Sequence, residues 1–131
     1  MKLAELPVLY LTTKGRQTGL PREIEIWFVA WGGRLYLLAE HFRRAQWVRN
    51  IESHSRVQVR LGDRDLGAVA RVLDPERDAE AWRTAQELAR KKYGWGQGLP
   101  IQIIPDEPLE PAPASEHAAT RRLPEGSVNA K

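Results

Sequence analysis

The sequence has 131 residues and no cysteine, which fits one domain and excludes a disulfide framework, a thiolate metal site and a cysteine nucleophile. The apolar runs are too short to span a bilayer and no charged-then-apolar leader is present, so a cytoplasmic location is expected. Residues 1–104 hold 17 Lys and Arg against 12 Asp and Glu, a net +5, whereas residues 105–131 hold 3 against 5, a net −2. The basic part favours anionic partners such as phosphates, carboxylated cofactors or nucleic acid.

A basic turn between two apolar segments is the first feature along the chain. Residues 8–11 predict a buried strand, and residues 23–29 alternate polar and apolar before becoming fully apolar, which predicts a half-buried strand. Gly15 and Gly19 allow the chain to turn between them. A solvated hairpin turn is the plainer interpretation, but an anionic ligand needs the cations and hydroxyl gathered here. They belong to Lys14, Arg16, Thr18 and Arg22.

The middle of the chain predicts a second hairpin and a short helix. The Gly32-Gly33 pair predicts a turn into a strand over residues 34–39. A helix follows from about Arg43 to Ser53, with Trp47 on its apolar face.

The second half of the chain alternates strands with one longer helix. Strands are predicted over residues 57–61, 66–73 and 101–104, with a turn at Gly62 and Asp63. Between the last two, Asp74 is predicted to cap a helix that has Pro75 at its first position and that Gly94 ends.

These elements, about six antiparallel strands and two helices, predict a mainly β fold. The early connections are too short for parallel crossovers, so we expect a small antiparallel barrel with its helices outside or across one end. From Pro105 onward the sequence is rich in Pro, Ala, Glu and Ser and lacks periodicity. We therefore expect a barrel domain over residues 1–105 and a tail over residues 106–131.

The chemistry-bearing side chains point to a cofactor rather than to a hydrolase. The chain contains no nucleophile elbow, phosphate loop or dinucleotide turn. Its three histidines lack metal-ligand spacing, so no metal site is expected. Arg43 and Arg44 stand at the predicted start of the short helix, which favours an anion. A flat apolar wall for a phosphate-bearing cofactor is available from Trp27, Tyr36 and Trp47, although packing alone explains Trp47 equally well.

At these residues the sequence resembles the deazaflavin-dependent nitroreductase family, the split-barrel flavin and deazaflavin oxidoreductases. The resemblance covers roughly residues 7–105. It depends on the T-x-G-R-x-[ST]-G-x-P-R turn of residues 13–22, the segment 33–39, and the W-x-x-N helix of residues 45–51 followed by residues 57–59. It implies a split β-barrel that binds reduced coenzyme F-420 (F420), a deazaflavin, and passes a hydride to a quinone, nitroaromatic or other electron-poor acceptor.

The resemblance also implies roles for individual residues. Arg16 and Arg22 would contact the anionic part of the cofactor, and Trp47 and Asn50 would border its groove. Gln17 stands in the same cradle where many relatives have lysine. Tyr93 lies in a region where family members place tyrosines near the substrate, and either it or solvent would supply a proton.

Other functions remain open at this stage. The cofactor could be FMN or heme in the same barrel, and the protein could carry a cofactor without turning it over. A more distant alternative is a small basic barrel that binds single-stranded nucleic acid, although no nucleic-acid signature is present. Related barrels often dimerise, so a homodimer is expected.

Overall fold

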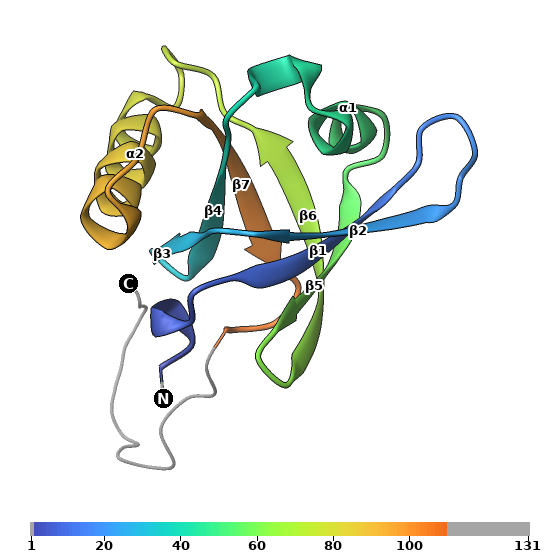
Figure 1. Ribbon diagram of the computed structural model, residues 1–131, viewed down its shortest axis with the longest axis horizontal. Helices are drawn as coiled ribbons and strands as arrows, with labels where there is room; N and C mark the ends of the chain where they lie inside the picture. Colours follow the sequence, from blue (N-terminus) through green and yellow to red (C-terminus); the bar gives the residue numbers. More distant parts are fainter. Residues whose placement is uncertain (1, 110–131) are drawn as a thin grey trace.

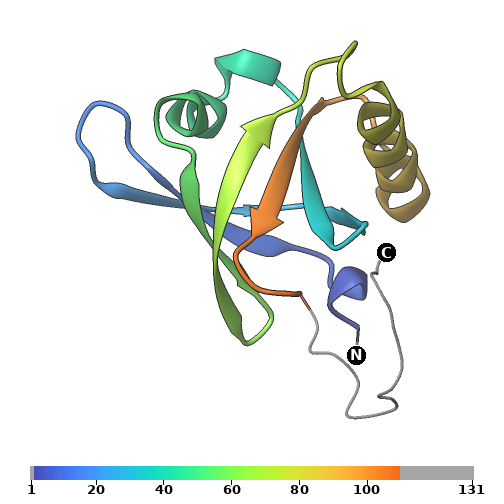
Figure 2. The ribbon, with the colours of Figure 1, turned by 180° about the vertical axis from the view of Figure 1, so that it is seen from behind.

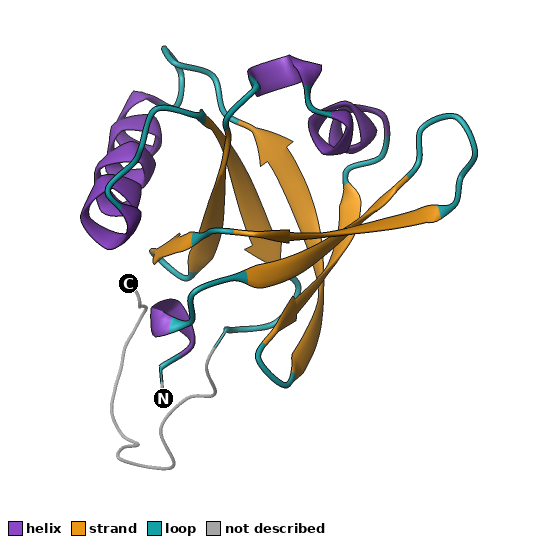
Figure 3. Ribbon diagram, in the orientation of Figure 1, coloured by secondary structure: helices purple, strands orange, loops and turns teal. Residues whose placement is uncertain are grey.

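Seven antiparallel strands form one curved sheet in the computed structural model, which describes residues 2–109 (Figure 1). Two α-helices and two short 3-10 helices flank the sheet (Figure 3). The strands are β1 (Leu9–Lys14), β2 (Pro21–Ile26), β3 (Val29–Trp31), β4 (Arg34–Ala39), β5 (Arg56–Leu61), β6 (Arg64–Val72) and β7 (Leu99–Pro105). The helices are η1 (Leu3–Glu5), η2 (Phe42–Arg44), α1 (Gln46–Ser53) and α2 (Ala79–Tyr93). The expectation of a mainly β split barrel with two helices is confirmed.

The sheet closes on itself through a two-residue joint. The strand order is β2-β1-β5-β6-β7-β4-β3, so β2 and β3 lie at opposite ends of the sheet although only Trp27 and Phe28 separate them in the chain. This joint brings the two edges together, as the view from behind also shows (Figure 2). The single strand predicted over residues 23–29 is therefore two strands, which raises the count from six to seven.

Side chains from α2 explain why strand pairing stops at this joint. The backbone N–H of Phe28 donates to the hydroxyl oxygen of Tyr93 at 3.1 Å, and the Phe28 carbonyl accepts from Lys92 Nζ at 3.0 Å. These bonds satisfy backbone groups that would otherwise need a neighbouring strand. A contact about 65 residues away along the chain thus splits the predicted strand.

The core lies inside the curved sheet. Alternation on β5 buries Val57, Val59 and Leu61 while the residues between them stay exposed. Phe28 from the joint is among the largest fully buried side chains and packs in the same cluster. The Gly32-Gly33 hairpin is confirmed, because both glycines adopt positive φ between Trp31 and its partner Arg34.

The predicted helix over residues 43–53 is wrong at its start. Residues 42–44 form η2, and Ala45 is extended with φ −67° and ψ 134°, so α1 begins only at Gln46. Phe42 has a φ of +53°, a conformation that is uncommon for an aromatic residue and that no local pattern indicates. Consequently Arg43 and Arg44 lie on η2 rather than at the first turn of α1.

Helix α2 begins one turn later than predicted. Its N-cap is Asp78 rather than Asp74, and Pro75 lies in the preceding turn. Asp74 nevertheless caps that turn, because its Oδ1 accepts from the N–H groups of Glu76 and Arg77 at 2.8 and 2.9 Å. The stop at Gly94 is confirmed by its left-handed φ of 80°.

The last strands also differ from the prediction. Strand β6 begins and ends earlier than residues 66–73, and β7 is longer than residues 101–104 at both ends. The predicted domain boundary falls where β7 ends, although the next residue, Asp106, still donates its N–H to the Gly67 carbonyl and pairs with Arg56. Residues 110–131 of the predicted tail lie outside the described residues.

Replacing Phe28 by alanine is expected to lower the free energy of unfolding by about 3–5 kcal/mol, because a buried aromatic ring is lost at the joint that closes the sheet. Chemical denaturation followed by circular dichroism measures this change. Trp31→Ala is the matched control, because Trp31 is 38% exposed against 1% for Phe28. Equal losses in the two variants would contradict a structural role for the joint.

Folding stability is expected to fall in acid partly through Asp78. Its carboxylate accepts from Arg71 at 3.0 Å and from the Asp74 N–H at 2.8 Å. These bonds lower the pKa of Asp78, and the Arg71 bond has the largest effect. A lowered folded pKa contributes stability above the ordinary Asp pKa of about 4, and this contribution is lost as the pH falls through the folded value. Asp78→Asn should therefore be less stable near neutral pH and lose less stability on acidification. Parallel acid dependence in the two proteins would contradict this.

Candidate functional site

Two adjoining cavities lie between the helices and the β1–β3 segment. The smaller one, of about 390 Å³, is lined by the β1–β2 turn and the first turns of α1. The larger one, of about 530 Å³, is lined by the β2–β3 joint, β4 and the C-terminal end of α2. Trp47 lines both, so a single tryptophan forms a wall common to the two.

The smaller cavity is basic. Arg16 and Arg22 line it together with Gln17 and Thr18, and none of the described residues that line it is acidic. The Arg22 side chain makes no hydrogen bond or ion pair with another described residue, so its guanidinium is available to a ligand. A cavity with this donor set suits a carboxylate or phosphate group.

Asn50 holds the basic turn against α1. Its Oδ1 accepts from the backbone N–H of Arg16 at 3.2 Å and from Arg16 Nη1 at 3.1 Å. Its Nδ2 donates to Thr13 Oγ1 at 3.1 Å, and both Asn50 and Thr13 are buried. Because its carboxamide is engaged on both sides, Asn50 acts on the cavity by orienting Arg16. The turn projects beside α1 in Figure 1.

Six of the nine sequence-predicted cofactor residues line the smaller cavity: Arg16, Gln17, Thr18, Arg22, Trp47 and Asn50. The other three, Lys14, Arg43 and Arg44, are exposed and line neither cavity. Arg43 instead pairs with Glu52 at 3.0 Å on the surface. The extended Ala45 explains why Arg43 and Arg44 do not line the cavity, because it separates them from the start of α1.

The larger cavity is mainly apolar, and aromatic side chains form a large part of its wall. Trp27 and Tyr93 stack with ring centroids 4.3 Å apart and an interplanar angle of 4°. Trp27 is 48% exposed, so one flat face of this pair borders open space. Trp47, Trp95, Phe28 and Tyr36 are the other aromatic residues of the lining. Such walls favour a flat conjugated ligand.

Tyr93 is fixed by its hydroxyl group. The hydroxyl oxygen accepts from the Phe28 N–H. The carbonyl oxygens of Pro7 and Phe28 lie 2.8 and 2.9 Å away, and the hydroxyl donates its proton to this pair of acceptors. Burial raises the pKa of Tyr93, against a smaller opposite effect of the Phe28 hydrogen bond. The ring thus lines the cavity while the only hydroxyl proton is engaged by the backbone, which favours a positioning role over proton donation.

Lys92 stabilises the same part of the cavity wall through contacts with the N-terminal segment and Phe28. Its Nζ donates to the carbonyls of Ala4, Leu6 and Phe28 at 2.7–3.0 Å and lies 4.0 Å from the centroid of the Phe28 ring. Burial lowers the pKa of Lys92. The N-terminal segment and the β2–β3 joint are therefore attached to the end of α2.

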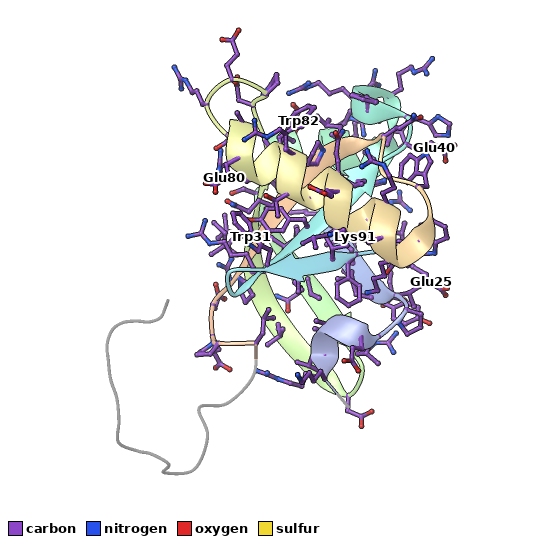
Figure 4. All side chains as sticks on the ribbon, turned by 90° about the vertical axis from the view of Figure 1, so that its left-hand side faces the viewer. Glu25, Trp31, Glu40, Glu80, Trp82 and Lys91 are labelled. Atoms are coloured by element: carbon purple, nitrogen blue, oxygen red, sulfur yellow. The ribbon has the colours of Figure 1, made fainter. Side chains whose placement is uncertain are left out.

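Sequence reasoning missed the polar rim of the larger cavity. Glu25, Glu40 and His41 line it, and none of the three side chains has a hydrogen bond or ion pair within residues 2–109. Figure 4 shows Glu25 and Glu40 on the same side of the molecule as the C-terminal end of α2. No local signal marks these residues, because they meet only when the sheet closes. Among the described residues, no group of three or more His, Asp or Glu side chains is arranged to hold a metal.

Removing the Asn50 carboxamide is expected to destabilise the protein. Asn50→Ala leaves the buried Thr13 hydroxyl and Arg16 without a partner, which should cost about 1–3 kcal/mol of unfolding free energy. Gln46→Ala is the control, because Gln46 lines the same cavity but is exposed. Urea denaturation measures both, and a loss no larger than that of the control would contradict the bridging role.

Comparison with solved structures supports the fold. An F420-H2 dependent reductase (FDR-A) is 24% identical, with a TM-score of 0.58 over 75% of this chain and 93% of that one. The heme storage protein HutZ from Vibrio cholerae is 20% identical, with a TM-score of 0.63 over 77% of this chain and 82% of that one. An FAD-binding protein from Mesorhizobium loti is 13% identical, with a TM-score of 0.63 over 80% and 83%. At these identities the likeness establishes the split barrel alone.

The sequence itself matches a family. Residues 1–106 match the family described as F420H(2)-dependent quinone reductase. The matched segment includes all seven strands and every residue that lines the two cavities. The basic turn, the W-x-x-N helix and the aromatic cavity all lie within this match. The chain therefore belongs to the F420H2-dependent quinone reductase family and is an oxidoreductase.

Proposed function

We propose that this chain binds reduced coenzyme F420 across the two adjoining cavities and supports its oxidation by a quinone, nitroaromatic or other electron-poor acceptor. One observation carries the proposal: Trp47 is shared by a basic cavity on one side and an aromatic cavity on the other. An elongated ligand with an anionic chain and a flat ring meets both requirements at once.

The residues present fit this cofactor. The anionic chain of F420 would bind beside Arg16 and Arg22, with Thr18 as a hydroxyl donor, and the flat ring would lie beside Trp47. When bound, reduced F420 supplies the hydride.

The charges of the cavities favour one orientation of the cofactor. Arg16 and Arg22 line only the smaller cavity, whereas Glu25 and Glu40 line only the larger one. An anion is attracted to the first and repelled by the second. The ring end is therefore directed toward the aromatic cavity, where an acceptor would lie against it, and uncharged acceptors are favoured over anionic ones.

The contribution of the protein to the reaction is mainly positioning. Asn50 orients Arg16, and the hydrogen bonds of Tyr93 hold its ring against Trp27. Holding two reactants in contact removes a large part of the entropic barrier to their reaction. FMN also combines a flat ring with a phosphate and is the alternative cofactor.

The assembly and location of the protein are part of the same proposal. We expect a homodimer, and one similar solved structure, 25% identical with a TM-score of 0.56 over 75% of this chain and 79% of that one, is described as a domain-swapped dimer. None of the helices in residues 2–109 combines the length and apolar character needed to cross a membrane. We also propose a cytoplasmic location, with which the lack of cysteine is compatible.

Arg22→Ala is expected to weaken F420 binding about tenfold or more, because a charge-assisted hydrogen bond is removed from the basic cavity. Arg16→Ala should weaken binding similarly and also release Asn50. Equilibrium titration followed by the absorbance of the cofactor measures this, with FMN titrated in parallel.

Arg43→Ala is the matched control, because Arg43 lines neither cavity. Its affinity for F420 should be unchanged. Wild-type affinity in the Arg22→Ala protein, or equal weakening in the control, would remove the basic cavity from the cofactor site. Tight binding of FMN without binding of F420 would favour the alternative cofactor.

A further inference from the structure

We propose that His41 donates the proton that completes reduction of the acceptor. The inference rests on the proposed function, because it concerns the acceptor in the larger cavity. His41 lines that cavity and is exposed to solvent. Its imidazole has no hydrogen bond or ion pair with another residue in the range 2–109, so both ring nitrogens are available.

The reaction requires a proton beyond the hydride. A quinone that accepted a hydride would become a hydroquinone monoanion, and reduced F420, after giving up the hydride and releasing one proton to solvent, would become oxidised F420. One further O–H bond must then form at the anionic oxygen. In our proposal the imidazolium N–H bond of His41 breaks, its proton goes to this oxygen, and the neutral imidazole recovers a proton from water.

The two tyrosines of the cavity are poorly placed to do this. The Tyr93 hydroxyl proton is engaged by a backbone carbonyl at 2.8–2.9 Å. The Tyr36 hydroxyl oxygen accepts from Gln102 Nε2 at 3.1 Å, and both residues are buried. The Tyr93 proton is thus engaged by the backbone, and the Tyr36 hydroxyl belongs to a buried side chain away from solvent.

The carboxyl groups are unsuitable for a different reason. Exposed carboxylates are ionised at neutral pH and carry no proton to donate. Imidazole is the side chain that can be protonated and deprotonated near neutral pH, which a general acid requires. Four other titratable side chains line the cavity with His41. Glu40 lies on the same turn, Glu25 on β2, Tyr36 on β4 and Tyr93 on α2.

The backbone holds His41 at the edge of the cavity. Its carbonyl accepts from the Arg44 N–H at 3.0 Å, and this hydrogen bond closes the first turn of η2. The next residue, Phe42, has a positive φ. The residue is thus fixed at a turn between β4 and η2. A side chain there can reach both the cavity and water, as a proton donor that must be recharged needs to do.

The first test is a binding measurement without cofactor. The probe is 2-hydroxy-1,4-naphthoquinone, which is anionic at neutral pH and resembles the reduced acceptor before protonation. Binding to the wild-type protein should tighten about tenfold or more between about pH 8 and about pH 5.5, because imidazole as a side-chain type gains a proton near neutral pH and a cation binds an anion more strongly. His41→Gln should lose this pH dependence. His54→Gln should keep it, because His54 ends α1 and lines neither cavity.

The second test is turnover of a neutral quinone. His41→Ala should lower kcat about a hundredfold without weakening F420 binding, and added imidazole should restore part of the rate. His54→Ala should leave both unchanged.

The outcomes separate this inference from the proposed function. Wild-type binding of F420, together with unaltered pH dependence and kcat in the His41 variants, would overturn only the role of His41 and assign the proton to solvent. Failure of the wild-type protein to bind F420 would overturn both. Loss of pH dependence with rescue by imidazole would establish the donor.

Discussion

The carboxamide of Asn50 is the polar group that attaches the basic turn to the rest of the structure. From its place on helix α1, Asn50 binds Thr13 on β1 and both the backbone and the guanidinium of Arg16 in the β1–β2 turn. The turn is closed by its own backbone hydrogen bonds between Gly15 and Leu20 and between Gly19 and Gly15, and Asn50 adds its attachment to α1. With this attachment, Arg16 is held against Asn50, which lies one helical turn after Trp47 on α1, and the basic and aromatic cavities share Trp47 as a wall.

A second constraint fixes the opposite side of the larger cavity. The sheet closes where β2 and β3 meet, and backbone groups that have no strand partner there are satisfied by Lys92 and Tyr93. Both side chains come from the last turn of α2. The same contacts that close the half-barrel therefore also place the Trp27–Tyr93 stack, so the fold and the acceptor cavity are built by one set of bonds.

Much of the fold could be predicted from local patterns. Alternation identified the strands, and the Gly32-Gly33 pair identified a hairpin, because these signals come from neighbouring residues. The break between β2 and β3 could not be predicted, because it is imposed by α2 from about 65 residues away. The positive φ of Phe42 could not be predicted either, and nor could the extended Ala45, which separates Arg43 and Arg44 on η2 from the start of α1.

The candidate site shows the same division. The residues of the basic turn and of the W-x-x-N helix were identified because they form a recognisable pair of motifs. Glu25, Glu40 and His41 were not assigned to a cavity, since Glu25 is distant in the sequence from the adjacent Glu40 and His41, and the three line one cavity only in the folded chain. Tyr93 was noticed, but its hydroxyl partners on Pro7 and Phe28 could not be inferred from sequence.

The central claim is that one ligand spans both cavities, with Trp47 between its anionic chain and its ring. A crystal structure of the protein with F420 bound tests it most directly. The account predicts the anionic chain beside Arg16 and Arg22 and the ring beside Trp47, facing the Trp27–Tyr93 stack. A cofactor bound in the reverse orientation, or outside these cavities, would contradict it.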